Sequence, residues 1–161
     1  MTETINALQV PTGIKVPAPM QEAQERLLSR FHPENTPQAS RLQAVINNES
    51  SALIFALIGD ETDETTPWQA TPSERYVGTL TLIGLESTTR LSGYIEHVVV
   101  DEAYEGRGIG GLLLAKALVV AESKNASRVD LTSNASKEAA QRLYEKMGFR
   151  KRETNNWRYE F

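Results

Sequence analysis

A chain of 161 residues with 40% hydrophobic and 24% charged residues has the composition of one globular domain. The net charge of −4 disfavours a protein that coats nucleic acid, and the absence of cysteine excludes disulfides, cysteine-ligated metals and a cysteine nucleophile. With two histidines, no apolar run long enough for a bilayer and no secretory signal pattern at the start, we expect a cytoplasmic protein without metal, membrane or nucleic-acid partners.

The first hundred residues predict four strands and two helices. Alternating or continuously apolar segments predict strands at 4–10, 52–58, 76–86 and 93–100. Apolar residues at helical spacing predict a helix from Pro19 that ends at His32-Pro33, and a second that starts at Thr36-Pro37 and stops near Asn47. The last three strands are expected to form an antiparallel meander, after a lead-in at 1–17.

The remainder of the chain predicts two more helices and three more strands. A helix is expected from the glycine-rich stretch near 106–111 to about Lys124, and another from a cap at Ser136 to Met147, closed by a left-handed Gly148. The expected strands are 128–132, 149–154 and 157–161. This order predicts a single α/β domain with a mixed, mostly antiparallel sheet of about six or seven strands and about four helices.

A long polar connection at 60–75 separates the second and third predicted strands. Its acidic start and Trp68 suggest a lid that favours a cationic amine, whereas a solvated mobile loop is the simpler interpretation. The acidic residues concerned are Asp60, Glu61, Asp63 and Glu64.

The glycine-rich stretch between a strand and a helix has three interpretations. It could permit only a tight turn and close packing of the helix on the sheet. It also fits the dinucleotide pattern G-x-G-x-x-G through Gly106, Gly108 and Gly111, with Asp130 as a ribose-binding acid, although a meander rather than a βα unit precedes it. Finally, backbone N–H groups at a helix N-terminus bind anions such as a pyrophosphate.

Two motifs favour the third interpretation. The segment V-V-V-D-x-x-Y-x-G-R-G-I-G-x-x-L-L resembles motif A of the GNAT N-acetyltransferases, and LTSNASKEAAQRLYEKMGF (131–149) resembles their motif B. The resemblance implies the GNAT fold and acetyl-CoA as co-substrate. It implies cofactor contacts from Val98, Val99, Val100, Glu105, Gly106, Arg107, Gly108, Ile109, Gly110, Gly111, Asn134, Ser136 and Lys137.

One position departs from motif A. Glu105 stands where the family usually has Arg or Gln, and a carboxylate there would repel a pyrophosphate unless it turns away or pairs with a cation. Arg107, two residues on, is a candidate for that pairing. A further departure is Lys137, which stands roughly where many members have an Asn that bonds the pantetheine arm; the nearby Asn134 is a candidate substitute.

Two side chains are candidates for catalysis. The resemblance places Tyr144 next to the CoA sulfur as proton donor to the thiolate, with packing as the alternative role. Glu96 is an acid within an apolar strand, and the surrounding G-x-I-E-x-V-V-V resembles glucosamine-6-phosphate acetyltransferases, so Glu96 is the candidate base. His97, a water molecule, or a purely structural paired acid remain alternatives. A backbone N–H near Val98–Val100 is the candidate oxyanion donor.

The resemblance therefore predicts an acetyl-CoA-dependent N-acetyltransferase. We expect it to act on a primary amine by direct attack in a ternary complex, with a small molecule favoured over a protein as acceptor. The alternative is a non-catalytic acyl-CoA-binding or sensor module of the same fold. A homodimer is possible.

Overall fold

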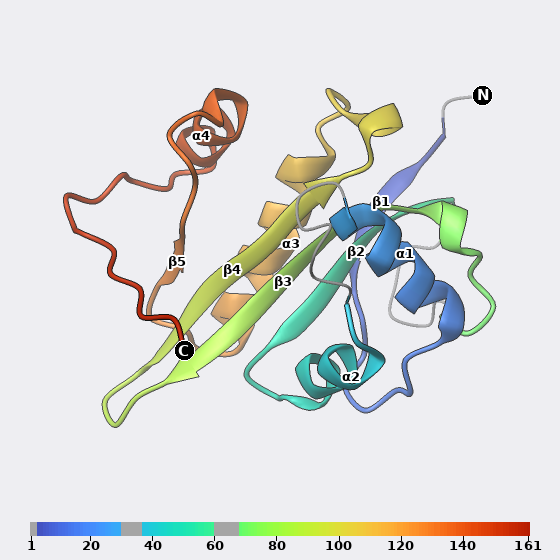
Figure 1. The fold of residues 1–161 in the computed structure, drawn as a ribbon, viewed down its shortest axis with the longest axis horizontal. Coiled ribbons are helices and arrows are strands. Elements are labelled where there is room, and N and C mark those ends of the chain that lie inside the picture. The colour runs from blue at the N-terminus through green and yellow to red at the C-terminus, as the bar shows by residue number, and fades with distance from the viewer. Residues whose placement is uncertain (1–2, 30–36, 60–67) are drawn as a thin grey trace.

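One mixed β-sheet organises the structure (Figure 1). The computed structural model describes residues 3–29, 37–59 and 68–161. The strands are β1 (Ile5–Gln9), β2 (Ala52–Ile58), β3 (Tyr76–Glu86), β4 (Leu91–Val100) and β5 (Val129–Leu131). The helices are α1 (Ala18–Ser29), α2 (Ala39–Asn47), α3 (Ile109–Ser123) and α4 (Glu138–Lys146), with two short 3₁₀ turns, η1 (Ser73–Arg75) and η2 (Glu102–Tyr104).

The strands lie in chain order across the sheet, β1-β2-β3-β4-β5. Strands β1 to β4 pair with one another in antiparallel fashion, which confirms the predicted meander of β2, β3 and β4. Only β5 is parallel to its neighbour, since α3 provides the long crossover that a parallel connection needs. The α/β class and mixed sheet are thus as the sequence predicts.

Strand β2 has apolar residues on both faces because helices cover both sides of the sheet. Leu53, Phe55 and Leu57 join a core cluster with residues of α1 and α2. The alternate residues Ala52, Ile54 and Ala56 join a second cluster with α3. Figure 1 shows α1 and α2 on one face and α3 on the other, so the continuous apolar run follows from this sandwich.

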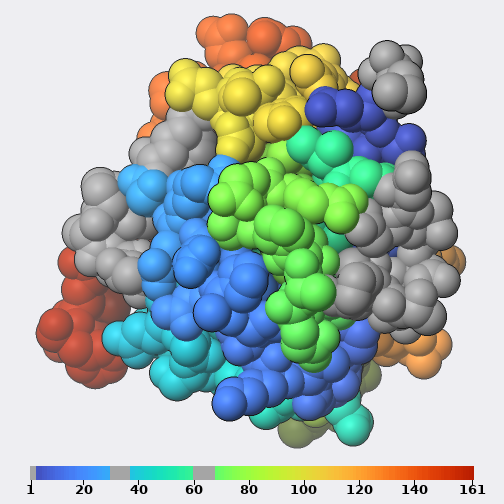
Figure 2. Space-filling view, turned by 90° about the vertical axis from the view of Figure 1, so that its right-hand side faces the viewer, coloured from blue at the N-terminus to red at the C-terminus, as the bar shows by residue number. Residues whose placement is uncertain are grey.

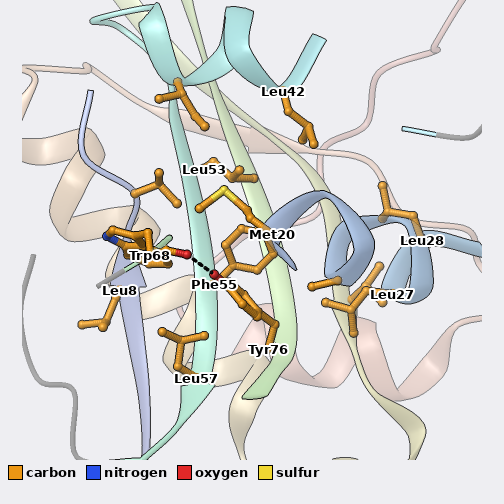
Figure 3. Packing of buried hydrophobic residues seen from close by; sticks show 14 residues of the cluster. Leu8, Met20, Leu27, Leu28, Leu42, Leu53, Phe55, Leu57, Trp68 and Tyr76 are labelled. Atoms are coloured by element: carbon orange, nitrogen blue, oxygen red, sulfur yellow. Dashed lines mark hydrogen bonds between the residues drawn. The ribbon is translucent and has the colours of Figure 1, made fainter. Parts of the chain in front are cut away.

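Three aromatic rings meet in the first of these clusters (Figure 3). Phe55 and Tyr76 pack edge to face with centroids 4.8 Å apart, and Trp68 lies 6.3 Å from Tyr76. Trp68 is only 2% exposed. It is therefore a core residue and not part of an exposed lid, while the acidic residues predicted for that lid lie outside the described ranges.

Two helix boundaries differ from prediction. Helix α2 begins at Ala39 after an N-cap at Gln38 that makes no side-chain capping bond, so Pro37 does not occupy its first position. The predicted helix end at His32-Pro33 and the predicted start of the second helix at Thr36 lie outside the described part of the chain. Helix α4 begins at Glu138, not at the predicted cap Ser136.

The predicted closing strands at 149–154 and 157–161 are wrong, so the sheet has five strands and not six or seven. The aromatic alternation at Trp157, Tyr159 and Phe161 is present, but the side chains are at least 81% exposed. A period-two pattern gives a local preference, whereas a strand also needs a partner, and residues 149–161 pair with none within the described chain.

A search of the described residues for a helix long and apolar enough to traverse a membrane finds none.

Candidate active site

A bulge in β4 shapes the centre of the sheet. Thr81 pairs with Glu96 and Thr79 pairs with Val99. Between these two pairs, β4 therefore contains one residue more than β3. The bulge includes His97, whose φ of 55° lies in the left-handed region. Histidine adopts this conformation more readily than most residues. The bulge interrupts the strict alternation of side chains between the two faces of β4 at Glu96 and His97.

Strands β4 and β5 separate where this bulge begins. Their parallel pairing covers only Gly93 to Ile95 on β4, which lie opposite Val129 to Leu131. Past Ile95, a pocket of about 160 Å³ opens between the two strands. Its lining residues are Ile95, Glu96, His97, Val98 and Val99 from β4, with Leu131, Thr132, Ser133, Asn134, Lys137 and Tyr144 from β5 and the segment that follows it.

The pocket brings together the two predicted catalytic side chains. Glu96 enters it half-buried from β4, and Tyr144 enters it half-buried from α4. Burial raises the pKa of the Tyr144 hydroxyl above its ordinary value. A phenol with a raised pKa remains protonated at neutral pH and can donate a proton or a hydrogen bond within the pocket.

Tyr144 is held in place by the end of its own helix. Phe149 N–H donates to the Tyr144 carbonyl at 3.0 Å, Gly148 N–H donates to the Glu145 carbonyl at 3.0 Å, and Gly148 has a φ of 91°. These two bonds form a Schellman C-cap, which confirms the predicted role of Gly148. The Phe149 ring then packs edge to face with Tyr144 at 6.1 Å.

The glycine-rich loop connects the end of β4 to α3. Asp101 Oδ1 accepts from Ala103 N–H at 3.1 Å and fixes η2, after which residues 105–108 are exposed. The first bond of the helix runs from Leu112 N–H to the Gly108 carbonyl at 3.2 Å. The N–H groups of residues 109–111 therefore precede the helical pattern, at the positive end of the α3 dipole.

The glycines of this loop serve two different purposes. Gly106 and Gly108 have φ values of 75° and 80°, and a Cβ on either would meet nothing within 4 Å, so these two shape an open stretch of backbone. A Cβ on Gly110 would lie 2.9 Å from Leu143 Cδ2, so Gly110 allows α3 to approach α4. Gly111 faces the same leucine at 3.8 Å, and Ile109 is buried in the α3 core.

Arg107 is oriented by two contacts. Its Nη1 lies 3.2 Å from Glu3 Oε2, and its guanidinium carbon lies 4.8 Å from the centroid of the Tyr104 ring. Glu3 is a partner for Arg107 that sequence reasoning did not find, because it comes from the far end of the chain. The predicted pairing of Glu105 with Arg107 stays a prediction.

Asn134 organises the turn between β5 and α4. Its Oδ1 accepts from Ser136 N–H at 3.0 Å and from Ser136 Oγ at 3.1 Å, and its carbonyl accepts from Lys137 N–H at 3.0 Å. Ser136 thus bonds to Asn134 and does not cap the helix. Asn134 and Lys137 line the pocket, while Ser136 is not among its lining residues.

The predicted site residues accordingly fall into two adjoining groups. One lines the pocket and includes both catalytic candidates; the other forms the loop and first turn of α3. Val100 closes β4 opposite Gly78, outside the pocket lining. Thr132 and Ser133 also line the pocket and were not predicted; their position directly after a strand was the available signal. Among the described residues, no group of three metal-ligating side chains is found.

The family model and the related sequences that match this chain are all acetyltransferases. The sequence model described as "Acetyltransferase (GNAT) family" matches residues 22–149. A glucosamine 6-phosphate N-acetyltransferase from Trypanosoma brucei brucei is 38% identical over 85 residues, which are 51% of this chain and 56% of that protein. An N-alpha-acetyltransferase 30 from Schizosaccharomyces pombe is 34% identical over 61 residues, 38% of this chain and 41% of that protein. The matches span about half the length of these relatives.

The fold also matches solved structures. An aminoglycoside acetyltransferase from an uncultured soil metagenomic sample, solved in complex with trehalose, superposes with a TM-score of 0.75 at 17% identity. The match covers 98% of this chain and 96% of that one. At this level of identity the likeness concerns the fold.

Proposed function

Because the chain belongs to the GNAT acetyltransferase family, we propose that it transfers the acetyl group of acetyl-CoA to a primary amine of a small molecule, with amino sugars as the acceptor class. The observation that carries this proposal is the pocket at the β4 bulge, which contains a half-buried carboxylate and a half-buried phenol, Glu96 and Tyr144. Family members use acetyl-CoA as co-substrate.

The loop before α3 would hold the anionic part of acetyl-CoA. The exposed backbone of Gly106 and Gly108 and the N–H groups at the start of α3 suit a pyrophosphate. Arg107, held by Glu3 and Tyr104, supplies a cation at the same loop. The pantetheine arm would then pass between β4 and β5, along Asn134 and Lys137, to reach the pocket.

The proposed reaction needs one base and one acid. The acceptor ammonium has an ordinary pKa of about 10, so it must lose a proton before it attacks. Glu96 takes that proton, directly or through a water molecule, and the amine nitrogen bonds to the thioester carbonyl carbon. A backbone N–H of β4 near Val98–Val100 stabilises the oxyanion. The carbon–sulfur bond then breaks, and Tyr144 gives its proton to the leaving thiolate. The second proton that the nitrogen must lose to become a neutral amide passes through water to the Tyr144 phenolate and restores the phenol, while Glu96 releases its proton to solvent.

The acceptor class is drawn from one relative and one sequence feature. The relative that is 38% identical bears the name glucosamine 6-phosphate N-acetyltransferase, whose named substrate is an amino sugar, and Glu96 stands in a segment that resembles those enzymes. The relative that bears the name N-alpha-acetyltransferase supports protein N-termini as the competing class.

A thiol-release assay tests the proposal. The protein is incubated with acetyl-CoA and, separately, glucosamine 6-phosphate, glucosamine, an aminoglycoside and a peptide with a free N-terminus. Thiol release with at least one amino sugar is the expected result. Release with the peptide alone would replace the acceptor class, and thermal stabilisation by CoA without release from any amine would favour the acyl-CoA-binding module.

A further inference from the structure

Gln24 is a polar residue on the apolar face of α1. The buried positions of this helix are Met20, Ala23, Gln24, Leu27 and Leu28, which have the spacing of one helix face directed at the sheet. Gln24 is only 2% exposed. A glutamine buried among apolar side chains loses its hydrogen bonds to water, so it destabilises the fold unless other groups replace them. Its presence on this face therefore points to a specific partner.

The partner is Thr79 on β3, which is completely buried. Thr79 Oγ1 donates to Gln24 Oε1 at 2.8 Å. In the sheet, Thr79 lies directly between Phe55 of β2 and Val99 of β4. Residues opposite one another in antiparallel strands point to the same face, and Phe55 and Val99 both belong to the core cluster that contains the apolar residues of α1. The hydrogen bond therefore ties this cross-strand row to the helix.

The row ends at the bulge of β4. Val99 is the first residue after the bulge that pairs with β3 again, and its partner is Thr79. Beside Thr79, a Cβ on Gly78 would lie 3.1 Å from the Val99 carbonyl oxygen and 3.1 Å from Leu113 Cδ1 of α3. The glycine thus lets β4 and α3 approach closely on the face opposite α1. The backbone just past the bulge is held by Gly78 and α3 on one face and by Thr79 and α1 on the other.

We propose that Gln24 and Thr79 are positioning residues for acetyl transfer, because their buried hydrogen bond fixes the backbone of β4 past the bulge. The inference rests on the proposed function, in which a backbone N–H near Val98–Val100 stabilises the oxyanion. Such a donor is effective only when it already points at the place that the oxyanion will occupy. Neither side chain is among the lining residues of the pocket, so both act through the backbone. Without the Thr79 hydroxyl, Gln24 Oε1 loses a buried donor, and the row shifts in response.

Steady-state kinetics test the role in transfer. Thr79→Val nearly keeps the shape of the side chain and removes the hydroxyl, whereas Thr79→Ser keeps the hydroxyl. In Thr79→Val we expect kcat to fall about 10-fold with little change in the KM for acetyl-CoA, since a misdirected oxyanion donor weakens only the binding of the transition state. Thr79→Ser should restore most of kcat. Gln24→Met should also lower kcat, but it should add little in the Thr79→Val background because the two side chains act as one unit.

Ser51→Ala is the matched control. The buried Ser51 hydroxyl also holds β3, since its Oγ accepts from Gly84 N–H at 3.1 Å. Gly84 pairs with Gly93, near the end of β4 that lies away from the bulge. This variant should lower Tm by a few degrees, as Thr79→Val does, and leave kcat unchanged. An unchanged kcat in Thr79→Val, or an equal loss of kcat in Ser51→Ala, would overturn the positioning role.

Hydrogen exchange followed by NMR tests the fixed backbone without any substrate. In Thr79→Val the amides of residues 98–100 should exchange about 10-fold faster than in the unaltered protein, while the amides of β1 keep their rates. Equal rates at residues 98–100 in the two proteins would overturn the inference even if acetyl transfer occurs. Faster exchange there, in a protein that transfers acetyl to none of the amines tested, would confirm the fixed backbone and refute the proposed function.

Discussion

Arg26 on α1 forms an ion pair with Asp101, the residue that caps the turn leading into the glycine-rich loop. The same guanidinium donates to the carbonyls of Ser73 at 3.1 Å and Tyr76 at 2.7 Å. Arg26 thereby joins three segments far apart in sequence. Figure 2 shows them together on one face, with the glycine-rich loop above α1 and the turn before β3.

This link predicts a specific effect of Arg26→Ala. The variant should bind CoA several-fold more weakly, because Asp101 loses the partner that orients the loop, and should unfold a few degrees lower, since about 1 kcal/mol corresponds to roughly 2–4 °C in a domain of this size. Titration calorimetry and thermal unfolding measure the two effects. Arg142→Ala removes an exposed pair with Glu138 and should change neither; equal effects of both substitutions would contradict the assignment.

Gly108→Asp should abolish the rise in Tm that CoA produces. The carboxylate would stand at the loop where the pyrophosphate is proposed to bind, and a ligand that no longer binds the folded state no longer stabilises it. Gly13→Asp is the matched control, because Gly13 has a φ of 83° and equally open surroundings. Both variants carry the same backbone strain, so a retained CoA shift in Gly108→Asp would place the phosphates elsewhere.

Tyr144→Phe should lower kcat by about 10²-fold, the scale of general acid catalysis, with CoA affinity nearly unchanged. The substitution preserves the ring that packs on Phe149 and removes only the hydroxyl. Tyr94→Phe, which removes a hydroxyl bonded to Thr132, controls for the loss of a phenol from the same region. Steady-state kinetics decide the matter, and an unchanged kcat in Tyr144→Phe would assign the residue to packing.

The raised pKa of the buried Tyr76 hydroxyl predicts that the protein loses stability at alkaline pH. Burial raises its pKa to about 12 from 10, so between these pH values the unfolded chain releases a proton that the folded chain retains. The contribution of Tyr76 to the free energy of unfolding should therefore be complete below pH 10 and should be lost as pH rises toward 12. The total loss for this one group is about 2–3 kcal/mol. Denaturant titrations of Tyr76→Phe should show a smaller decline; an identical decline would indicate that other groups dominate.

The sequence predicted those parts of the fold that depend on the spacing and type of neighbouring residues. The continuous apolar run of β2 and the left-handed Gly148 were visible as spacing and residue type, and both are confirmed. The β4 bulge was not visible, because an extra residue in a strand depends on how its neighbour pairs. Trp68 stands in a stretch with the composition of a polar loop, and its burial follows from tertiary packing against Phe55, Tyr76 and the rest of their core cluster.

In the candidate site, too, the sequence predicted individual residues but not the contacts between distant parts of the chain. Glu96 and Tyr144 were found from residue type and motif, and they do meet in one pocket. The contact between Arg107 and Glu3 joins residues over a hundred positions apart, which no local pattern encodes. The prediction of closing strands at 149–154 and 157–161 was wrong for a related reason. Alternation of side-chain type does not by itself provide a neighbouring strand to pair with.

The three-residue pairing between β4 and β5 also divides the molecule into parts of unequal cooperativity. The meander is held by long ladders and two buried clusters, whereas α4 has no fully buried residue and joins the sheet through β5. Segments with few buried contacts open without global unfolding, so amides of β5 and α4 should exchange with deuterium well before those of β2 and β3. The half of the pocket that carries Tyr144 would then open on a faster timescale than the half that carries Glu96.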